Sequence, residues 1–244
     1  MRALTATELL SVWERGLAQS ATERALLLLA TASSETPREV LAKLSIGQRD
    51  ACLLMLREWT FGPELVSLMT CPGCGERLEL TFKVSDLQVE TQTELAEALS
   101  LSVADYEVHF RLPNSLDLAA IAESDDVMVA RHLLLRRCLL AVQHDGEEIS
   151  AEQLPADVVE AVAERMAQAD PQADVQLAPS CPSCDHEWQA TFDIVSFFWS
   201  EIDAWAHRML RELHTLASAY GWREADILAM SPWRRRFYLE MVSG

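Results

Sequence analysis

Two stretches of the sequence decide the fold. The first is Cys71-Pro-Gly-Cys-Gly-Glu-Arg-Leu-Glu-Leu-Thr-Phe-Lys-Val84, and the second is Cys181-Pro-Ser-Cys-Asp-His-Glu-Trp-Gln-Ala-Thr-Phe-Asp-Ile194. They align without gaps, and in each a Cys-Pro-x-Cys turn is followed by residues that alternate between apolar and polar. Alternation with a period of two is typical of a β-strand. The repeat therefore predicts two equivalent units, each a cysteine-bearing turn that runs into a strand.

The two turns carry four cysteines at the spacing that metal sites use. The start of the chain includes an acid, Glu8, and no cleavage pattern, so we expect no signal peptide and a cytoplasmic location. Because thiols stay reduced in that compartment, metal ligation is favoured over disulfides. A structural zinc ion takes four ligands in a tetrahedron, and two facing turns supply them. We therefore predict one structural Zn²⁺ site, formed by Cys71, Cys74, Cys181 and Cys184.

Other interpretations of the cysteines are weaker. A redox pair would start a helix after a strand, whereas each turn here leads into strand-like sequence. An iron–sulfur cluster stays open as the alternative metal group, and His186 as an alternative ligand, although a place beside the site or on the surface is favoured for this histidine. Four thiolates leave no open coordination position, so we do not expect the metal to be catalytic. Cys52 and Cys138 lie in apolar helical patterns and are expected to be small buried residues.

Charge and composition exclude several classes of function. The chain has 38 acidic and 20 basic residues, a net charge of −18. A surface this negative repels nucleic-acid phosphates and anionic lipid heads, which disfavours binding to nucleic acid or to a membrane surface. The longest aliphatic run, residues 25–30, is far shorter than the roughly 20 residues that cross a bilayer. The sequence has no phosphate-binding loop, nucleophile elbow, zinc-protease helix or dinucleotide turn, so we predict no enzymatic activity and no small-molecule substrate.

Hydrophobic periodicity places helices on both sides of the cysteine turns. It predicts helices within residues 7–32, 38–44, 48–60, 93–99, 116–122, 125–141 and 155–169, and strands at 78–84 and 106–112. Five apolar residues of the segment 125–141 are expected to form a buried face: Val127, Val129, Leu133, Leu134 and Leu140.

The strongest periodic signal lies in residues 196–220. Seven apolar residues recur there at alternating spacings of three and four: Trp199, Ile202, Ala206, Met209, Leu213, Leu216 and Tyr220. This seam predicts a long central core helix, and a docking seam for a partner helix is the alternative. The predicted fold class is α+β, predominantly helical, with two short strand-bearing zinc knuckles like those of a zinc ribbon and a long C-terminal core helix.

Four regions follow from this order of elements. Residues 1–70 form an N-terminal helical region, and residues 71–113 the first zinc knuckle with its strands. Residues 114–172 form a middle helical insertion. Residues 173–244 carry the second knuckle, the long helix and a C-terminal helix pair. We expect the four regions to be integrated in one domain, because the predicted metal site joins the second region to the fourth.

The last two short helices resemble a helix-turn-helix, with Pro232 at the start of the second. They suggest a zinc-containing DNA-binding or regulatory protein as the alternative function, which the charge of the whole chain disfavours. Aromatic residues and arginines dominate the energetics of protein interfaces. We therefore predict a partner-binding site at Trp233, Arg234, Arg235, Arg236, Phe237 and Tyr238.

Several segments resemble a family encoded beside phage-tail-like contractile injection systems. The family is similar to the T-even phage baseplate hub assembly proteins, also called hub assembly chaperones. Besides both cysteine turns, the segments are Trp13-Glu-Arg-Gly, Arg111-Leu-Pro-Asn-Ser-Leu-Asp-Leu, Tyr220-Gly-Trp-Arg-Glu-Ala-Asp-Ile-Leu and Arg235-Arg-Phe-Tyr-Leu-Glu-Met. The resemblance covers nearly the whole chain. It implies a non-enzymatic assembly factor or structural component that binds baseplate hub or other tail-like particle proteins and can be incorporated into the particle.

Overall fold

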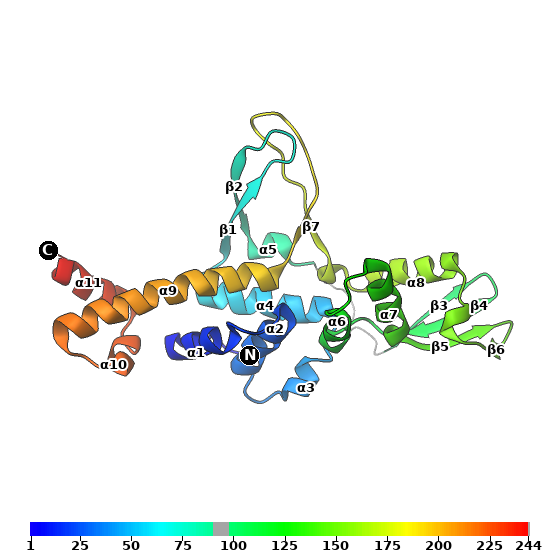
Figure 1. Ribbon diagram of the computed structural model, residues 1–244, viewed down its shortest axis with the longest axis horizontal. Helices are drawn as coiled ribbons and strands as arrows, with labels where there is room; N and C mark the ends of the chain where they lie inside the picture. The colour runs from blue at the N-terminus through cyan, green and yellow to red at the C-terminus, as the bar shows by residue number, and fades with distance from the viewer. Residues whose placement is uncertain (90–97, 244) are drawn as a thin grey trace.

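A body of helices runs along one long helix, α9 (Ile194–Tyr220), in the computed structural model (Figure 1). The structure describes residues 1–89 and 98–243. Helices of the first third of the chain and of its end surround α9. They are α1 (Ala6–Gly16), α2 (Ala21–Ala32), α3 (Arg38–Leu41), α4 (Ile46–Phe61), α5 (Val84–Leu87), α10 (Glu224–Leu228) and α11 (Pro232–Ser243).

The core of this body lies between α9 and the helices α1, α2 and α4. The predicted seam of α9 is buried at every position except Tyr220, which is 37% exposed. Leu28, Leu53 and Leu56 of α2 and α4 are completely buried in the same cluster. Burying each such side chain contributes roughly 1.5–3 kcal/mol. The prediction of a central core helix is therefore confirmed.

An arm of two antiparallel hairpins projects from the body, as Figure 1 shows. One hairpin pairs β1 (Glu64–Thr70) with β2 (Arg77–Lys83), and the other pairs β7 (Val175–Leu177) with β8 (Ala190–Phe192). Phe82 and Phe192 meet edge to face, with ring centroids 5.6 Å apart, so the two hairpins contact each other above the body. Each hairpin carries one Cys-Pro-x-Cys turn at its far end.

A second unit contains a four-stranded antiparallel sheet in sequential order. Its strands are β3 (Leu99–Val103), β4 (Tyr106–Phe110), β5 (Leu139–His144) and β6 (Glu147–Glu148). Helix α8 (Ala156–Ala169) packs on the sheet and buries Val158 and Val162 against Val108, Phe110 and Val142. The connections include α6 (Ser115–Ile121), α7 (Val127–Cys138) and the short 3₁₀ turns Ala151–Gln153 (η1) and Pro171–Ala173 (η2).

The mixed helical and sheet architecture confirms the α+β class, whereas the predicted helix over residues 125–141 is wrong at its end. Helix α7 ends at Cys138, and the following residues form β5, because they pair with β4 instead of continuing the helix. Its predicted buried face is largely in solvent, with Val127 79% and Val129 56% exposed. The predicted helix at residues 93–99 lies mostly outside the described residues, and Leu99 begins β3. The division of the chain into four regions, with boundaries after residues 70, 113 and 172, stays a prediction.

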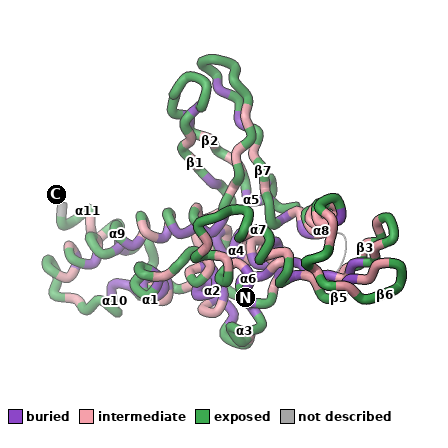
Figure 2. Tube along the Cα trace, turned by 45° about the vertical axis from the view of Figure 1, so that its right-hand side comes forward, coloured by how far each residue is buried: buried purple, intermediate pink, exposed green. Residues whose placement is uncertain are grey.

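The helical body and the arm differ in how far their residues are buried (Figure 2). The purple, buried segments gather in the helical body, whereas most of the arm is exposed or intermediate. Within residues 1–89 and 98–243, no helix combines the length and the apolar character that crossing a bilayer requires.

The short turn η2 is attached to the first turn of α4. The buried carboxylate of Asp170 accepts a hydrogen bond of 2.9 Å from the backbone N–H of Gly47. A negative charge at a helix N-terminus is favourable because the first backbone N–H groups have no partner within the helix. The side chain of Gln172 bridges Leu87 and Val89 at 3.1 and 2.8 Å. These bonds tie the chain that returns from the sheet unit to the helical body.

The substitution Gly47→Ala tests this attachment. Alanine in place of glycine within a helix normally stabilises a protein by up to about 1 kcal/mol. Here the added Cβ would lie 1.9 Å from Oδ1 of Asp170 and 3.0 Å from the backbone nitrogen of Ala173. Overpacking costs about 1–3 kcal/mol, so we expect a lower midpoint in urea denaturation. In an Asp170→Ala background the contact with Oδ1 is absent, so Gly47→Ala should lower the stability by less. A Gly47→Ala variant that is more stable than the unchanged protein would contradict the close contact.

Candidate metal centre

The two Cys-Pro-x-Cys turns have the same backbone hydrogen bonds. In the first, the N–H of Cys71 donates to the carbonyl of Glu76 at 2.8 Å, and the N–H of Gly75 donates to the carbonyl of Cys71 at 2.9 Å. The fifth residue of each turn has a positive φ, which is 78° at Gly75 and 54° at Asp185. The equivalent bonds of the second turn join Cys181 to His186 and to Asp185, at 2.9 and 2.8 Å.

The structure brings the four cysteine sulfurs together at the end of the arm. The sulfurs of Cys71 and Cys184 are 3.7 Å apart, those of Cys74 and Cys181 are 3.6 Å apart, and all four lie within 4.8 Å of one another. Zinc–thiolate bonds of about 2.3 Å imply sulfur–sulfur distances of about 3.8 Å in a regular tetrahedron. The cluster therefore has the dimensions of a four-thiolate site. Each close pair joins one turn to the other, so a bound ion would link the two hairpins.

Burial and local hydrogen bonds affect the ionisation of these thiols in opposite directions. Burial alone would raise the pKa of Cys71, but backbone N–H groups of Cys74 and Gly73 and the neighbouring thiols outweigh it and lower this pKa to about 7. The backbone N–H of His186 favours the thiolate of Cys184, yet the adjacent thiols and burial together raise its pKa to about 12. Like charges in contact oppose one another, so four thiolates can coexist here only around a cation.

Two side chains of the second turn pack beside the sulfurs without joining them. The ring of His186 covers Gly73, where an added Cβ would lie 3.0 Å from the imidazole Cγ, and it stacks on Trp188 with centroids 6.0 Å apart. Trp188 also packs against the buried cluster of Cys71, Leu78 and Cys181. Among the described residues, the group of converging ligand atoms at this place contains the four cysteines and not His186.

The remaining cysteines lie elsewhere in the fold. Cys138 is completely buried at the end of α7, where burial raises the pKa of its thiol to about 11. Cys52 lies half-buried in α4, and burial raises its pKa as well. Raised pKa values keep both thiols protonated and unreactive, so the sequence-based view of Cys138 as a small buried residue is confirmed, and Cys52 is only partly buried.

A second group of side chains could offer metal ligands at the tip of the sheet unit. Asp105, His144 and Asp145 lie on two neighbouring turns, with their ligand atoms within 4.8 Å of one another. Both carboxylates are exposed. Exposed acidic side chains at turns are common without a metal, so we assign no site to them.

The structure divides the six residues predicted to bind a partner. Trp233 and Phe237 are 77% and 51% exposed, and Arg234 and Arg236 also face solvent. Arg235 is only 5% exposed. Tyr238 packs edge to face on Trp222, with centroids 4.8 Å apart. The three consecutive arginines therefore do not share one surface, because Arg235 is buried inside the protein.

Arg235 makes its bonds within the chain. Its guanidinium lies 3.2 Å from the carboxylate of Glu212 on α9 and donates at 2.9 Å to the carbonyl of Met230. These bonds and the burial of Arg235 hold α11 against α9. The partner-binding site at these six residues stays a prediction, and four of the six side chains are exposed.

Comparison with known proteins gives one family. The family model described as T4 bacteriophage base plate protein matches residues 9–199, which include both cysteine turns, the sheet unit and the first residues of α9. No curated protein and no solved structure matches the chain. The matched range covers most of the chain, and it agrees with the resemblance that the sequence segments carry. The chain belongs to the T4 bacteriophage base plate protein family.

Proposed function

We propose that the protein is a non-enzymatic component or assembly factor of a phage-tail-like baseplate, and that it acts by binding other baseplate proteins. The family match over residues 9–199 is the observation that carries this proposal. The partners are hub proteins or other proteins of the tail-like particle. Assembly takes place in the cytoplasm, and the protein either enters the finished particle or leaves after assembly.

A structural Zn²⁺ ion held by the four cysteines is the second part of the proposal. The sulfur distances of 3.6 and 3.7 Å support a tetrahedral ion, and the burial of Cys71 and Cys181 supports a closed site. Four thiolates fill the coordination sphere, so such an ion stabilises the fold and offers no position for a substrate. An ion bound there would lie at the end of the arm, away from the helical core, and would link the two hairpins at their far ends.

Co-expression tests the assembly role. The full chain is produced together with each baseplate protein encoded beside it, and complexes are isolated and their subunit ratio is measured by light scattering. We expect at least one stable complex with a hub or other baseplate protein. If a folded, metal-loaded chain forms no complex with any of them, the proposed assembly role is wrong. Metal analysis of the same preparation distinguishes zinc from iron. Iron at the site would overturn the zinc assignment but not the assembly role.

A further inference from the structure

We infer that the outward face of α11 is a preformed docking surface for an acidic segment of another protein, one that presents an apolar stripe flanked by carboxylates. The α11 face is defined by Trp233, Arg234, Arg236, Phe237 and Met241. This inference rests on the proposed role in baseplate assembly and names the chemistry of one partner. The face lies outside residues 9–199, the part of the chain that the family model matches.

Three apolar side chains form a row along the exposed side of α11. Trp233, Phe237 and Met241 are spaced by four residues and are 77%, 51% and 53% exposed. The rings of Trp233 and Phe237 stack, with centroids 5.9 Å apart and planes inclined by 15°. Residues four apart lie on one side of a helix, so the three side chains make one continuous apolar strip. Exposed apolar strips rimmed by polar groups are typical of interaction sites.

The inner face of α11 holds the helix in place before any partner arrives. Arg235 pairs with Glu212 of α9 at 3.2 Å, and it also binds the carbonyl of Met230 at the turn that precedes α11. The rings of Tyr220 and Trp222 stack on each other, and Tyr238 packs edge to face against both, with centroid distances of 5.8 and 4.8 Å. A surface that is ordered in advance loses less conformational entropy on binding than a flexible segment does.

Charge selects the kind of partner. Arg234 and Arg236 border the apolar row. Arg236 lies 3.2 Å from the exposed carboxylate of Glu240 on the same helix, and the guanidinium of Arg234 lies 5.7 Å from the ring of Tyr238. The chain as a whole is strongly acidic, with a net charge of −18. Two copies of such a chain repel each other, and so do the chain and a nucleic acid. A partner that is acidic only in its docking segment meets less of this repulsion, and its carboxylates and apolar residues match the arginines and the apolar row.

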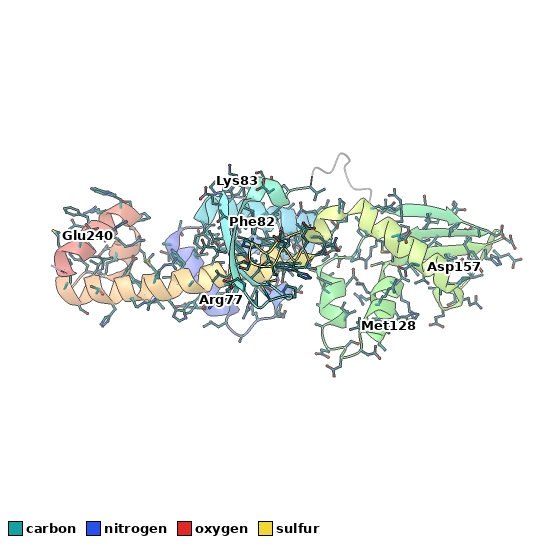
Figure 3. The ribbon with its side chains drawn as sticks, turned by 90° about the horizontal axis from the view of Figure 1, so that it is seen from above. Arg77, Phe82, Lys83, Met128, Asp157 and Glu240 are labelled. Atoms are coloured by element: carbon teal, nitrogen blue, oxygen red, sulfur yellow. The ribbon has the colours of Figure 1, made fainter. Side chains whose placement is uncertain are left out.

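The exposed face of α7 provides a comparison. It also presents apolar side chains, with Val127 79% and Met128 68% exposed. Its arginines Arg131 and Arg136 pair with carboxylates of other segments, Glu160 and Glu152, whereas the carboxylate beside Arg236 belongs to the same helix. Nothing there indicates the charge of a partner, so we use this face as a control. Figure 3 shows Glu240 of α11 at one end of the molecule and Met128 far from it, on the side of the sheet unit.

Photo-crosslinking tests the position of the docking surface. The full chain carries the photoreactive residue benzoylphenylalanine in place of Trp233, or in place of Met128 as the control, and is co-expressed with the neighbouring baseplate proteins. We expect a crosslink from position 233 to a baseplate protein, at an acidic segment identified by mass spectrometry, and none to that segment from position 128. Crosslinks from position 233 to a second copy of the chain, to nucleic acid, or to nothing while a complex forms would each overturn the inference.

Charge reversal tests the chemistry of the partner. The double variant R234E/R236E is compared with R15E/R38E, which changes two exposed arginines on α1 and α3 and therefore alters the net charge equally. We expect R234E/R236E to weaken binding of the crosslinked baseplate protein by about 30-fold, and R15E/R38E to change it little. Equal effects of both variants would overturn the inference. If every variant forms the complex equally well, the docking inference is wrong and the proposed assembly role stands. If the unchanged chain forms no complex, both the inference and the proposed role are wrong.

Discussion

Replacing Cys181 by serine is expected to abolish metal binding. Cys181 is completely buried, and its sulfur lies 3.6 Å from that of Cys74 on the other turn. A serine hydroxyl is not a zinc ligand in structural sites, and three remaining thiolates leave the ion incompletely coordinated. Metal content, measured by elemental analysis after purification, should fall from about one ion per chain to about none. Cys52→Ser is the matched control, because Cys52 lies in α4 away from the cluster, and it should keep the ion.

The structural consequence of this loss should be confined to the arm. The cluster around Cys71, Leu78 and Cys181 is separate from the large core of the helical body. An ion that links residues 113 positions apart, Cys71 and Cys184, restricts a long loop of the chain, and its binding free energy becomes folding free energy. We therefore expect faster amide hydrogen exchange in β1, β2, β7 and β8, with the circular-dichroism signal of the helices retained. Full metal content in the variant, or loss of the helical signal, would show that this account of the site is incorrect.

The paired cysteine turns and the long helix α9 could be predicted from the sequence, the first from a sequence repeat and the second from the spacing of apolar residues. The two cysteine turns share their sequence and their backbone hydrogen bonds, because a Cys-Pro-x-Cys turn is a local structure that depends on neighbouring residues alone. A tetrahedral metal needs four ligands, which is why the spacing of two such turns already suggested that they meet. The seam of α9 was predictable for a similar reason, since its period of three and four residues requires a helix with one buried side.

The features that depend on distant partners could not be predicted from the sequence. Leu139 and Leu140 continue the helical pattern of α7, but both belong to β5, where Leu139 pairs with Phe110 of β4 and Leu140 lies at the register shift. Strand pairing outweighs a weak local preference here. Arg235 looks equivalent to Arg234 and Arg236 in the sequence. Only the position of Glu212 on another helix turns it inward.

A network of ion pairs and hydrogen bonds around Asp117 is a further feature that the sequence did not predict. This carboxylate is completely buried, and it accepts hydrogen bonds from the guanidinium of Arg111 at 2.5 and 2.9 Å and from Nε of Arg137 at 2.9 Å. It also accepts a bond of 3.0 Å from the backbone N–H of Asn114, which caps α6. The network joins the end of β4, the start of α6 and the end of α7, and so it determines how the sheet unit meets its connecting helices.

Asp117→Asn is therefore expected to be strongly destabilising. The amide removes the negative charge and leaves two arginines with no counter-ion at this place, while Asp117 itself has no access to water. Breaking a buried ion pair by removing one partner costs about 3–5 kcal/mol, and the partial exposure of both arginines places our expectation near the lower limit, about 3 kcal/mol. The measurement is the free energy of unfolding in urea. Asp125→Asn is the control, since Asp125 is exposed and should change this free energy by less than about 0.5 kcal/mol.

The same network predicts a specific dependence of stability on pH. Burial would raise the pKa of Asp117, but the hydrogen bonds from Arg111, Asn114 and Arg137 outweigh it and hold this pKa below its ordinary value of 3.8. A carboxyl group whose pKa is lowered by folding contributes stability above its unfolded pKa, and this contribution is lost as the pH falls through the folded pKa. The unchanged protein should thus lose stability below about pH 4, and Asp117→Asn should lose less over the same interval. Parallel pH profiles for the two proteins would mean that Asp117 does not supply this stability, and that other carboxyl groups determine the behaviour in acid.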